Sequence, residues 1–165
     1  MEPIPDKNVP PETAGRVWSS HLDQAAACLS ARGTSLTPFR EAVLQELVTS
    51  VQPLGAYEIA TRLGRHMGKS VAANSVYRVL DVLLAAGLVQ RIESKQAYCL
   101  SPLDAGAGRI LLMCEDCGSV ETIEGGEVAE ALEQESQAAH FRPRRKVIEV
   151  TGICQSCDEA GKGPA

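Results

Sequence analysis

Four of the six cysteines in this 165-residue chain form two CxxC pairs, a spacing typical of metal binding. Cys114 and Cys117 make up the first pair, and Cys154 and Cys157 make up the second. Two intervening residues allow one tight turn to direct both thiolates at a single ion, and two such turns complete a tetrahedron around zinc. Because 36 residues separate the pairs, the ion must join distant parts of one domain. We therefore predict one structural zinc ion per chain.

Other interpretations of the four cysteines stay open. A thioredoxin-like dithiol needs one CxxC motif within a βαβ unit, whereas this chain has two such motifs. Four thiolates can also hold iron, as in rubredoxin-like sites. A disulfide framework is not expected, because the N-terminus lacks a basic, apolar signal segment and no apolar run is long enough to span a membrane. We therefore expect a cytoplasmic protein.

The net charge of −5 is distributed unevenly along the chain. Residues 1–100 carry a net charge of +1, whereas residues 101–165 carry −6. An acidic protein is on average a poor partner for nucleic acid, because phosphate contacts require Lys and Arg. The asymmetry, however, favours two units with different partners, of which only the second is strongly acidic.

The first hundred residues predict a winged helix-turn-helix after a disordered, proline-containing lead at 1–15. Apolar residues at helical spacing predict four short helices, and two strand-like runs after them predict a β-hairpin. The helices are expected at 16–31, 38–50, 55–67 and 73–87, and the strands at 88–92 and 96–100. Thr37 followed by Pro38 is a typical helix start. Short helices followed by a hairpin are typical of a winged-helix DNA-binding domain, here expected at 16–100.

Residues 101–108 are rich in small and turn-forming residues and predict a hinge. Residues 109–157 then predict a small α+β domain, followed by a tail at 158–165. The strands of this domain are expected at 109–113, 119–123 and 145–151, and its helix is expected at 127–139. The inward-facing residues of this helix are expected to be Val128, Ala131, Leu132 and Ala138. Zinc would compensate for the small core, and the exposed strand edges favour dimerisation.

The polar side of the expected helix at 73–87 predicts contact with DNA. Ser75 and Arg78 lie opposite its apolar residues, and Tyr77 lies at the flank. Arg78 can bind guanine through two hydrogen bonds, and Ser75 or Tyr77 can reach a phosphate or a thymine methyl group. Tyr57, at the start of the preceding helix, adds a further contact. A solvated polar face would show the same periodicity, so both interpretations stay open at this point.

Four motifs, in the right order, resemble the ferric uptake regulator (Fur) family. Segment 36–40 (LTPFR) resembles the opening signature of that family, and segment 75–80 (SVYRVL) resembles its recognition-helix signature. Segment 86–89 (AGLV) matches the turn into the wing, and the two CxxC pairs match the family's structural zinc site. Segments 55–58 (GAYE) and 146–149 (KVIE) look most like the zinc uptake regulator (Zur) branch.

The resemblance implies an α+β fold, with an N-terminal winged helix-turn-helix and a small C-terminal α/β dimerisation domain that holds a four-cysteine zinc site. It implies a homodimeric transcription regulator, in most cases a repressor, that binds a palindromic operator on double-stranded DNA and serves zinc-linked metal homeostasis. It also implies that Tyr57, Tyr77 and Arg78 contact DNA. Three scattered histidines and the lack of any Ser-His-Asp or Cys-His set predict that the chain is not an enzyme.

The chain departs from the family pattern at the regulatory metal site. The resemblance places Gln90 where the Zur branch has a His ligand, Ser101 where it often has Cys, and Thr122 where it has Glu. Three explanations stay open: a rearranged, weaker second metal site, the loss of metal sensing with constitutive DNA binding or a response to thiol oxidation, and a different ligand at the hinge. The rearranged site would consist of Cys99, Asp104 and Glu121.

Two further alternatives concern the thiols. Cys99 can be a small core side chain beneath the wing instead of a ligand. The whole protein can also belong to another functional class, a cytosolic zinc- or thiol-redox-responsive protein whose helical half is only a scaffold. The number of metal ions per chain separates these alternatives, because a single tight zinc ion supports lost or non-metal sensing and a second ion supports a rearranged sensor site.

Overall fold

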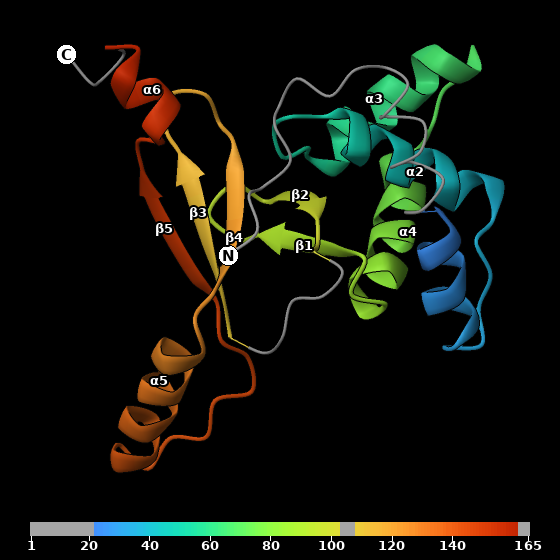
Figure 1. Ribbon diagram of the computed structural model, residues 1–165. Helices are drawn as coiled ribbons and strands as arrows, with labels where there is room; N and C mark the ends of the chain where they lie inside the picture. The colour runs from blue at the N-terminus through green and yellow to red at the C-terminus, as the bar shows by residue number, and fades with distance from the viewer. Residues whose placement is uncertain (1–21, 103–107, 162–165) are drawn as a thin grey trace.

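The computed structural model describes residues 22–102 and 108–161, which we call the N-terminal half and the C-terminal half. Helices dominate the N-terminal half, and a sheet with a helix at each end forms the C-terminal half (Figure 1). None of the helices in these residues is long and apolar enough to cross a lipid bilayer. The expected lead at 1–15 and most of the hinge at 101–108 lie outside the described residues.

The N-terminal half contains the four helices and the hairpin that the sequence predicts. They are a helix at 22–30, α2 (Pro38–Thr49), α3 (Ala56–Met67), α4 (Ala73–Ala85), β1 (Val89–Ile92) and β2 (Ala97–Leu100). The Thr37 side chain caps α2 by accepting a hydrogen bond from the Arg40 backbone N–H at 3.3 Å, and Pro38 occupies the first turn. Gly68 ends α3 with φ +63°, a conformation that favours glycine and turns the chain towards α4.

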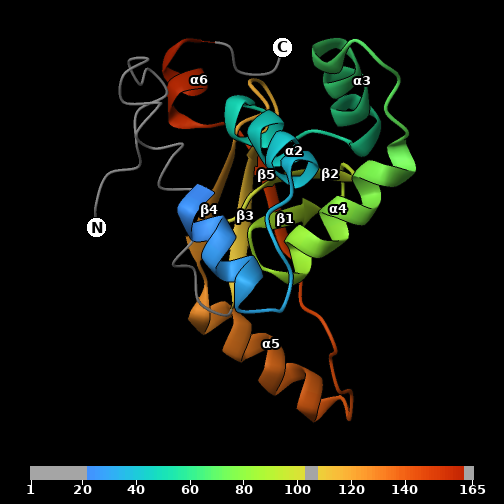
Figure 2. The same cartoon turned by 90° about the vertical axis from the view of Figure 1, so that its right-hand side faces the viewer.

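The three helices α2, α3 and α4 enclose the larger core. Figure 2 shows α2 and α4 in front of the C-terminal sheet. The buried residues of α4 are Val76, Val79, Leu80 and Leu83, all on the apolar face that the sequence predicts. The β1–β2 hairpin is the wing, and its residues Val89 and Tyr98 belong to this same core.

The C-terminal half is a three-stranded sheet with the order β4-β3-β5. Its elements are β3 (Arg109–Cys114), β4 (Val120–Glu124), α5 (Gly126–Ala138), β5 (Ile148–Gly152) and α6 (Gln155–Glu159). The central strand β3 pairs antiparallel with β4 and parallel with β5. Helices α5 and α6 lie at opposite ends of the sheet (Figure 1). The α+β fold with a wing and a small C-terminal sheet is therefore confirmed.

Two elements of the C-terminal half differ from the prediction. Strand β5 begins at Ile148, three residues later than expected, because its pairing with β3 starts with Ile148 opposite Ile110. Where the second CxxC pair predicts one tight turn, the structure has the short helix α6, which begins directly after Cys154.

The predicted inward face of α5 is not buried within the chain. No residue of α5 is buried, and Val128 and Leu132 are 43% and 42% exposed. The expectation for these two residues, and for Ala131 and Ala138, is therefore wrong for a single chain. The physical reason is that α5 extends beyond the end of the small sheet, where the other described residues leave most of its surface uncovered (Figure 1).

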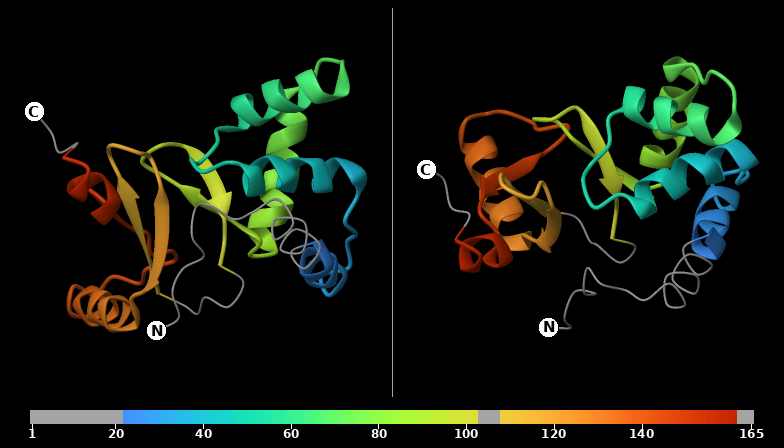
Figure 3. Two further views of the ribbon diagram at one scale, coloured as in Figure 1. Left: turned by 45° about the horizontal axis from the view of Figure 1, so that its top comes forward. Right: turned by 90° about the horizontal axis from the view of Figure 1, so that it is seen from above.

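The wing also packs against the C-terminal sheet, between that sheet and the helices (Figure 3). Ile92 of β1 is fully buried with Leu111 and Met113 of β3, and Cys99 and Val120 pack against these three side chains. We call these five residues the shared cluster. Apolar burial thus joins the two halves through the wing.

Replacement of Ile92 by alanine tests the shared cluster. We expect Ile92→Ala to lower the free energy of unfolding by about 3 kcal/mol, because it removes buried methyl groups and leaves a cavity between the halves. Urea denaturation followed by circular dichroism measures this change. Val51→Ala is the matched control, because Val51 is 65% exposed, and it should cost much less. Equal losses in the two variants would contradict a shared core at Ile92.

Candidate metal centre and nucleic-acid interface

The four cysteines of the two CxxC pairs meet at one end of the sheet. Cys114 ends β3, Cys117 follows in the next turn, Cys154 caps α6, and Cys157 is buried within α6. Because β3 and β5 are parallel neighbours, their carboxyl ends lie side by side, with Cys114 opposite Gly152. The turns that follow the two strands are therefore brought together even though many residues separate them in the chain.

The distances between the four sulfur atoms fit a tetrahedral zinc ion. All four Sγ atoms lie within 4.8 Å of one another, and Cys117 Sγ lies 3.8 Å from Cys154 Sγ. Zn–S bonds of about 2.3 Å place the sulfur atoms of a tetrahedron about 3.8 Å apart. Within the described residues, this is the one group of three or more Cys, His, Asp or Glu side chains that can hold a metal ion together. These four residues, which we call the four-cysteine cluster, are therefore the candidate metal centre.

The surroundings of the sulfur atoms favour thiolates in the first pair. Backbone N–H groups of Cys117 and Cys154 lower the pKa of Cys114 to about 6, and Ser119 lowers the pKa of Cys117. The neighbouring Cys154 and other thiols of the cluster raise the pKa of Cys157 to about 12. Several thiolates in one small space repel one another, and a bound cation removes that repulsion. The donor set thus has the chemistry that a divalent soft metal requires.

The residues predicted to contact DNA gather on the exposed surface of α3 and α4. Ser75, Tyr77 and Arg78 of α4 are exposed, and Tyr57 of α3 is 71% exposed. The rings of Tyr57 and Tyr77 meet edge to face, with their centroids 6.2 Å apart. Large aromatic side chains are seldom left in water without a partner that covers them. The structure therefore brings these predicted contacts to one exposed face.

Two basic residues that sequence reasoning did not assign to DNA lie next to this face. Arg65 and Lys69 line a groove of about 550 Å³ together with Tyr57 and Ala73, at the start of α4. No side chain caps the N-terminus of α4 and its first turn has no acidic residue, so its positive end faces no competing carboxylate of its own. The sequence signal for these residues was their position just before α4: Arg65 lies in the last turn of α3, and Lys69 lies between α3 and α4.

The residues of the predicted second metal site are only partly described. Cys99 and Glu121 both line a crevice of about 1020 Å³ beside the wing, whereas Asp104 lies outside the described residues. Cys99 also packs against the shared cluster, and this burial raises its pKa to about 11, although Gln90 opposes the shift. A thiol with such a pKa behaves as a small apolar side chain at neutral pH. The second metal site stays a prediction.

Comparison with known proteins adds independent information on this geometry. The model of the ferric uptake regulator family matches residues 31–151. The zinc uptake regulation protein of Escherichia coli is 32% identical over 145 residues, which cover 84% of this chain and 81% of that protein. The peroxide operon regulator of Bacillus subtilis is 29% identical over 140 residues, with 84% of this chain and 94% of that protein covered.

Solved structures show the same likeness. A zinc uptake regulator complexed with zinc and DNA superposes with a TM-score of 0.81 at 28% identity, over 88% of this chain and 97% of that one. The holo form of a second zinc uptake regulator gives a TM-score of 0.74 at 32% identity, over 85% of this chain and 98% of that one. The likeness extends across both halves of the chain.

Removal of one cysteine tests the metal centre. We expect Cys154→Ser to lose most of the zinc of the purified protein and to unfold at a lower temperature, because three thiolates bind the ion less tightly than four. Elemental mass spectrometry measures the zinc content. Cys28→Ser is the matched control, because Cys28 packs against the N-terminal core, and it should keep the metal. Full zinc content in Cys154→Ser would contradict a four-cysteine centre.

Proposed function

Since the chain belongs to the ferric uptake regulator family of DNA-binding transcription regulators, we propose that it is a repressor of zinc-homeostasis genes that binds a palindromic operator as a homodimer. The observation that carries this proposal is the TM-score of 0.81 to a zinc uptake regulator complexed with zinc and DNA, over 88% of the chain. The 32% identity to the zinc uptake regulation protein of Escherichia coli supports the same branch. Members of the family are regulators, not enzymes, and we expect the cytoplasm as the place of action.

We assign the reading of DNA bases to α4. The exposed Arg78 can bind a guanine edge through two hydrogen bonds, and Ser75 and Tyr77 can contact the neighbouring base or phosphate. The Tyr57 ring packs against the Tyr77 ring, and we expect Tyr57 to contact the DNA backbone next to Tyr77. Arg65 and Lys69 lie where the phosphate backbone would pass the start of α4. The positive end of α4 adds to the attraction for phosphate.

The exposed apolar face of the C-terminal half supports dimerisation. Its large apolar residues are Ile123, Val128, Leu132, Phe141, Val147 and Val150, all at least 38% exposed. A patch of this kind is typical of a protein interface, and a palindromic operator requires a two-fold symmetric partner, which a second copy of the chain provides. We propose that α5 and the neighbouring strands pack against their counterparts in that copy, with one structural zinc ion in each chain.

The alternative of a zinc- or thiol-redox-responsive protein with a helical scaffold is not favoured. The four-cysteine cluster by itself fits both functions, since thiolates bind zinc and also react with oxidants. A scaffold, however, gives no reason for the exposed Arg78 and the two tyrosines in edge-to-face contact on α3 and α4. The family and the zinc- and DNA-bound structural relative both favour transcription regulation.

Replacement of Arg78 tests the proposed DNA-reading surface. We expect Arg78→Ala to raise the Kd for operator DNA about tenfold or more and to relax the preference at one base pair, because a bidentate contact to guanine is lost. The probe is a duplex of about three helical turns, selected by the wild-type protein from a random library. Fluorescence anisotropy at fixed salt measures the Kd.

Two variants complete this test. Lys69→Ala should weaken binding to all duplexes alike and reduce the slope of log K against log salt by about 1, the signature of a phosphate contact. Arg142→Ala is the matched control, because Arg142 lies in the C-terminal half away from α4. If the wild-type protein selects no sequence from the library, or if Arg78→Ala binds as tightly as wild type, the proposed surface is wrong.

A further inference from the structure

A hydrogen bond joins the wing directly to the C-terminal sheet. Gln90 Nε2, on β1, donates to Thr122 Oγ1, on β4, at 2.7 Å and to the Leu100 carbonyl oxygen at 3.3 Å. Both side chains are partly buried, so water competes only weakly for these groups. The contact spans 32 residues of sequence and lies beside the shared cluster, which makes it a bridge between the two halves.

A second bridge holds the turn of the wing. The Glu149 carboxylate, on β5, accepts hydrogen bonds from the backbone N–H groups of Glu93 at 2.6 Å and Ser94 at 3.1 Å. Arg145 pairs with Glu93 at 2.5 Å. Partial burial alone would raise the pKa of Glu149, but the donors at Ser94 and Glu93 and the charge of Arg145 outweigh it and lower the pKa. The carboxylate is therefore charged at neutral pH, and charge-assisted bonds of this kind are strong.

The residues at the expected regulatory-metal positions do not fit a divalent cation. The amide nitrogen of Gln90 is directed at Thr122, so the pair is already satisfied by its own hydrogen bond. The buried hydroxyl of Ser101, at the remaining expected metal position, accepts a hydrogen bond from the Arg109 guanidinium. A positively charged group therefore lies beside that position. Metal ligands must be neutral or anionic donors of an electron pair, and a neighbouring guanidinium opposes a second cation.

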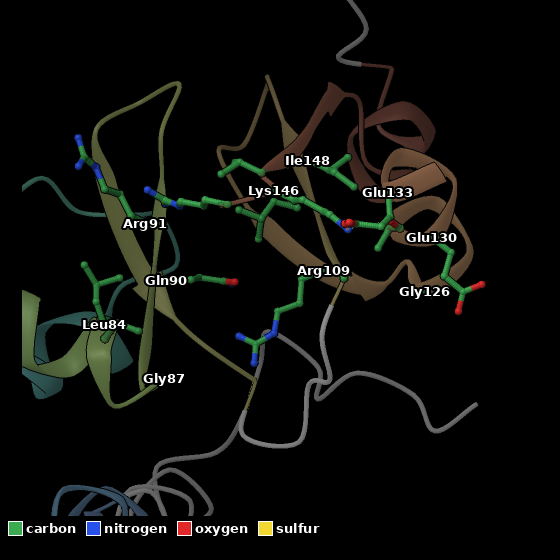
Figure 4. Close-up of a pocket in the computed structure, with 16 residues that line it drawn as sticks. Leu84, Gly87, Gln90, Arg91, Arg109, Gly126, Glu130, Glu133, Lys146 and Ile148 are labelled. Carbon is green, nitrogen blue, oxygen red and sulfur yellow. Dashed lines mark hydrogen bonds and ion pairs between the residues drawn. The ribbon is translucent and has the colours of Figure 1, made fainter. Parts of the chain in front are cut away.

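The other side of the wing is also unfavourable for a cation. Gln90 and Arg91 of the wing line one side of a crevice of about 890 Å³, and Arg109 and Lys146 line the other side. Figure 4 shows the Lys146 head group directed at Glu133 and the Arg91 guanidinium directed away from Lys146. Arg145 lines the same crevice. Lys146 is paired with Glu133, at 2.6 Å, so that carboxylate is already engaged. Four basic residues and two carboxylates, Glu130 and Glu133, thus line this crevice, and Arg91 and Arg145 are both paired with Glu93.

We propose that direct hydrogen bonds, in place of a second metal ion, hold the wing in the orientation that DNA binding requires, with Gln90, Thr122 and Glu149 as positioning residues. This inference rests on the proposed function, because it concerns how the same DNA-binding unit is regulated. Zinc then acts on DNA binding through the four-cysteine cluster alone. That cluster contacts the N-terminal half directly, since Gln52 Nε2 donates to the carbonyl oxygen of Cys117 at 2.9 Å.

The first experiment compares zinc content with DNA affinity. The full chain is purified with zinc and treated with a mild chelator, its zinc is counted by mass spectrometry, and the Kd for the selected duplex is measured before and after zinc is added back. We expect full affinity at one zinc ion per chain, with no more than about a twofold change on addition. A second stoichiometric zinc ion that tightens binding about tenfold or more would overturn the proposal.

The second experiment removes the Gln90–Thr122 bridge. We expect Gln90→Leu and Thr122→Val each to raise the Kd for the duplex about fivefold at unchanged zinc content, because one partly buried hydrogen bond is lost. The double variant should match the single variants instead of multiplying their effects, since both remove the same contact. Gln45→Leu on α2 is the matched control, because Gln45 is exposed and lies outside the interface. Wild-type affinity in the double variant, or fully multiplicative effects, would overturn the proposal.

The third experiment needs no DNA. Hydrogen exchange followed by NMR measures the amides of Glu93 and Ser94, and we expect Glu149→Ala to speed their exchange about tenfold or more, because both lose their acceptor. Amides of the two CxxC turns should be unchanged, which separates a loose wing from an unfolded sheet. Glu124→Ala is the matched control at the end of an outer strand. Unchanged exchange in Glu149→Ala would contradict the second bridge.

These outcomes distinguish a failure of the proposed function from a failure of the positioning role. If the wild-type protein selects no duplex, the proposed function fails while the exchange experiment still decides whether the second bridge exists. If the wild-type protein binds DNA but needs a second zinc ion, or if the Gln90→Leu, Thr122→Val double variant binds DNA as tightly as wild type, the proposed function stands and the positioning role fails.

Discussion

The wing packs against two cores at once, and this double contact sets the arrangement of everything else in the molecule. Val89 and Tyr98 belong to the core of the helices, whereas Ile92 is buried with Leu111 and Met113 of the C-terminal sheet. A two-stranded hairpin alone has little stability in water, so its position is set by what covers its faces. The orientation of the DNA-binding helices relative to the metal-binding half therefore follows from the packing of one short hairpin.

The metal centre and the small sheet depend on each other in a similar way. The parallel pairing of β3 and β5 brings the two CxxC turns together, and a metal ion held by four sulfur atoms would in turn fix the ends of these strands. A sheet of three strands with exposed outer surfaces buries too little apolar area to be very stable by itself. Because Gln52 donates a hydrogen bond to the carbonyl oxygen of Cys117, the four-cysteine cluster is also in direct contact with the helical half.

The uneven distribution of charge along the chain corresponds to the two halves of the structure. The acidic C-terminal residues lie in the half that holds the four-cysteine cluster, and the exposed surface of α3 and α4 belongs to the half whose net charge is slightly positive. An overall charge of −5 weakens long-range attraction to DNA, so the proposed site-specific contacts at Arg78 and its neighbours would have to supply more of the affinity. The proposed dimer would double those contacts and cover the apolar residues that α5 leaves exposed.

Short-range patterns in the chain were enough to predict the helices and the four cysteines that the structure brings together. Helical periodicity predicts the bounds of α2, α3 and α4 to within two residues. The Thr37–Pro38 pair predicts the start of α2, and the CxxC spacing predicts which four cysteines come together. The contacts across the interface, Gln90 with Thr122 and Glu149 with the turn at Glu93, could be identified only in the folded chain. The start of β5 at Ile148 was likewise known only from its pairing with β3. These hydrogen-bonded pairs are 32 and 56 residues apart in the sequence. No sequence pattern predicts which distant group a single polar side chain will bond to. Their pairing depends on how two folded halves meet, which is a property of packed surfaces and not of neighbouring residues.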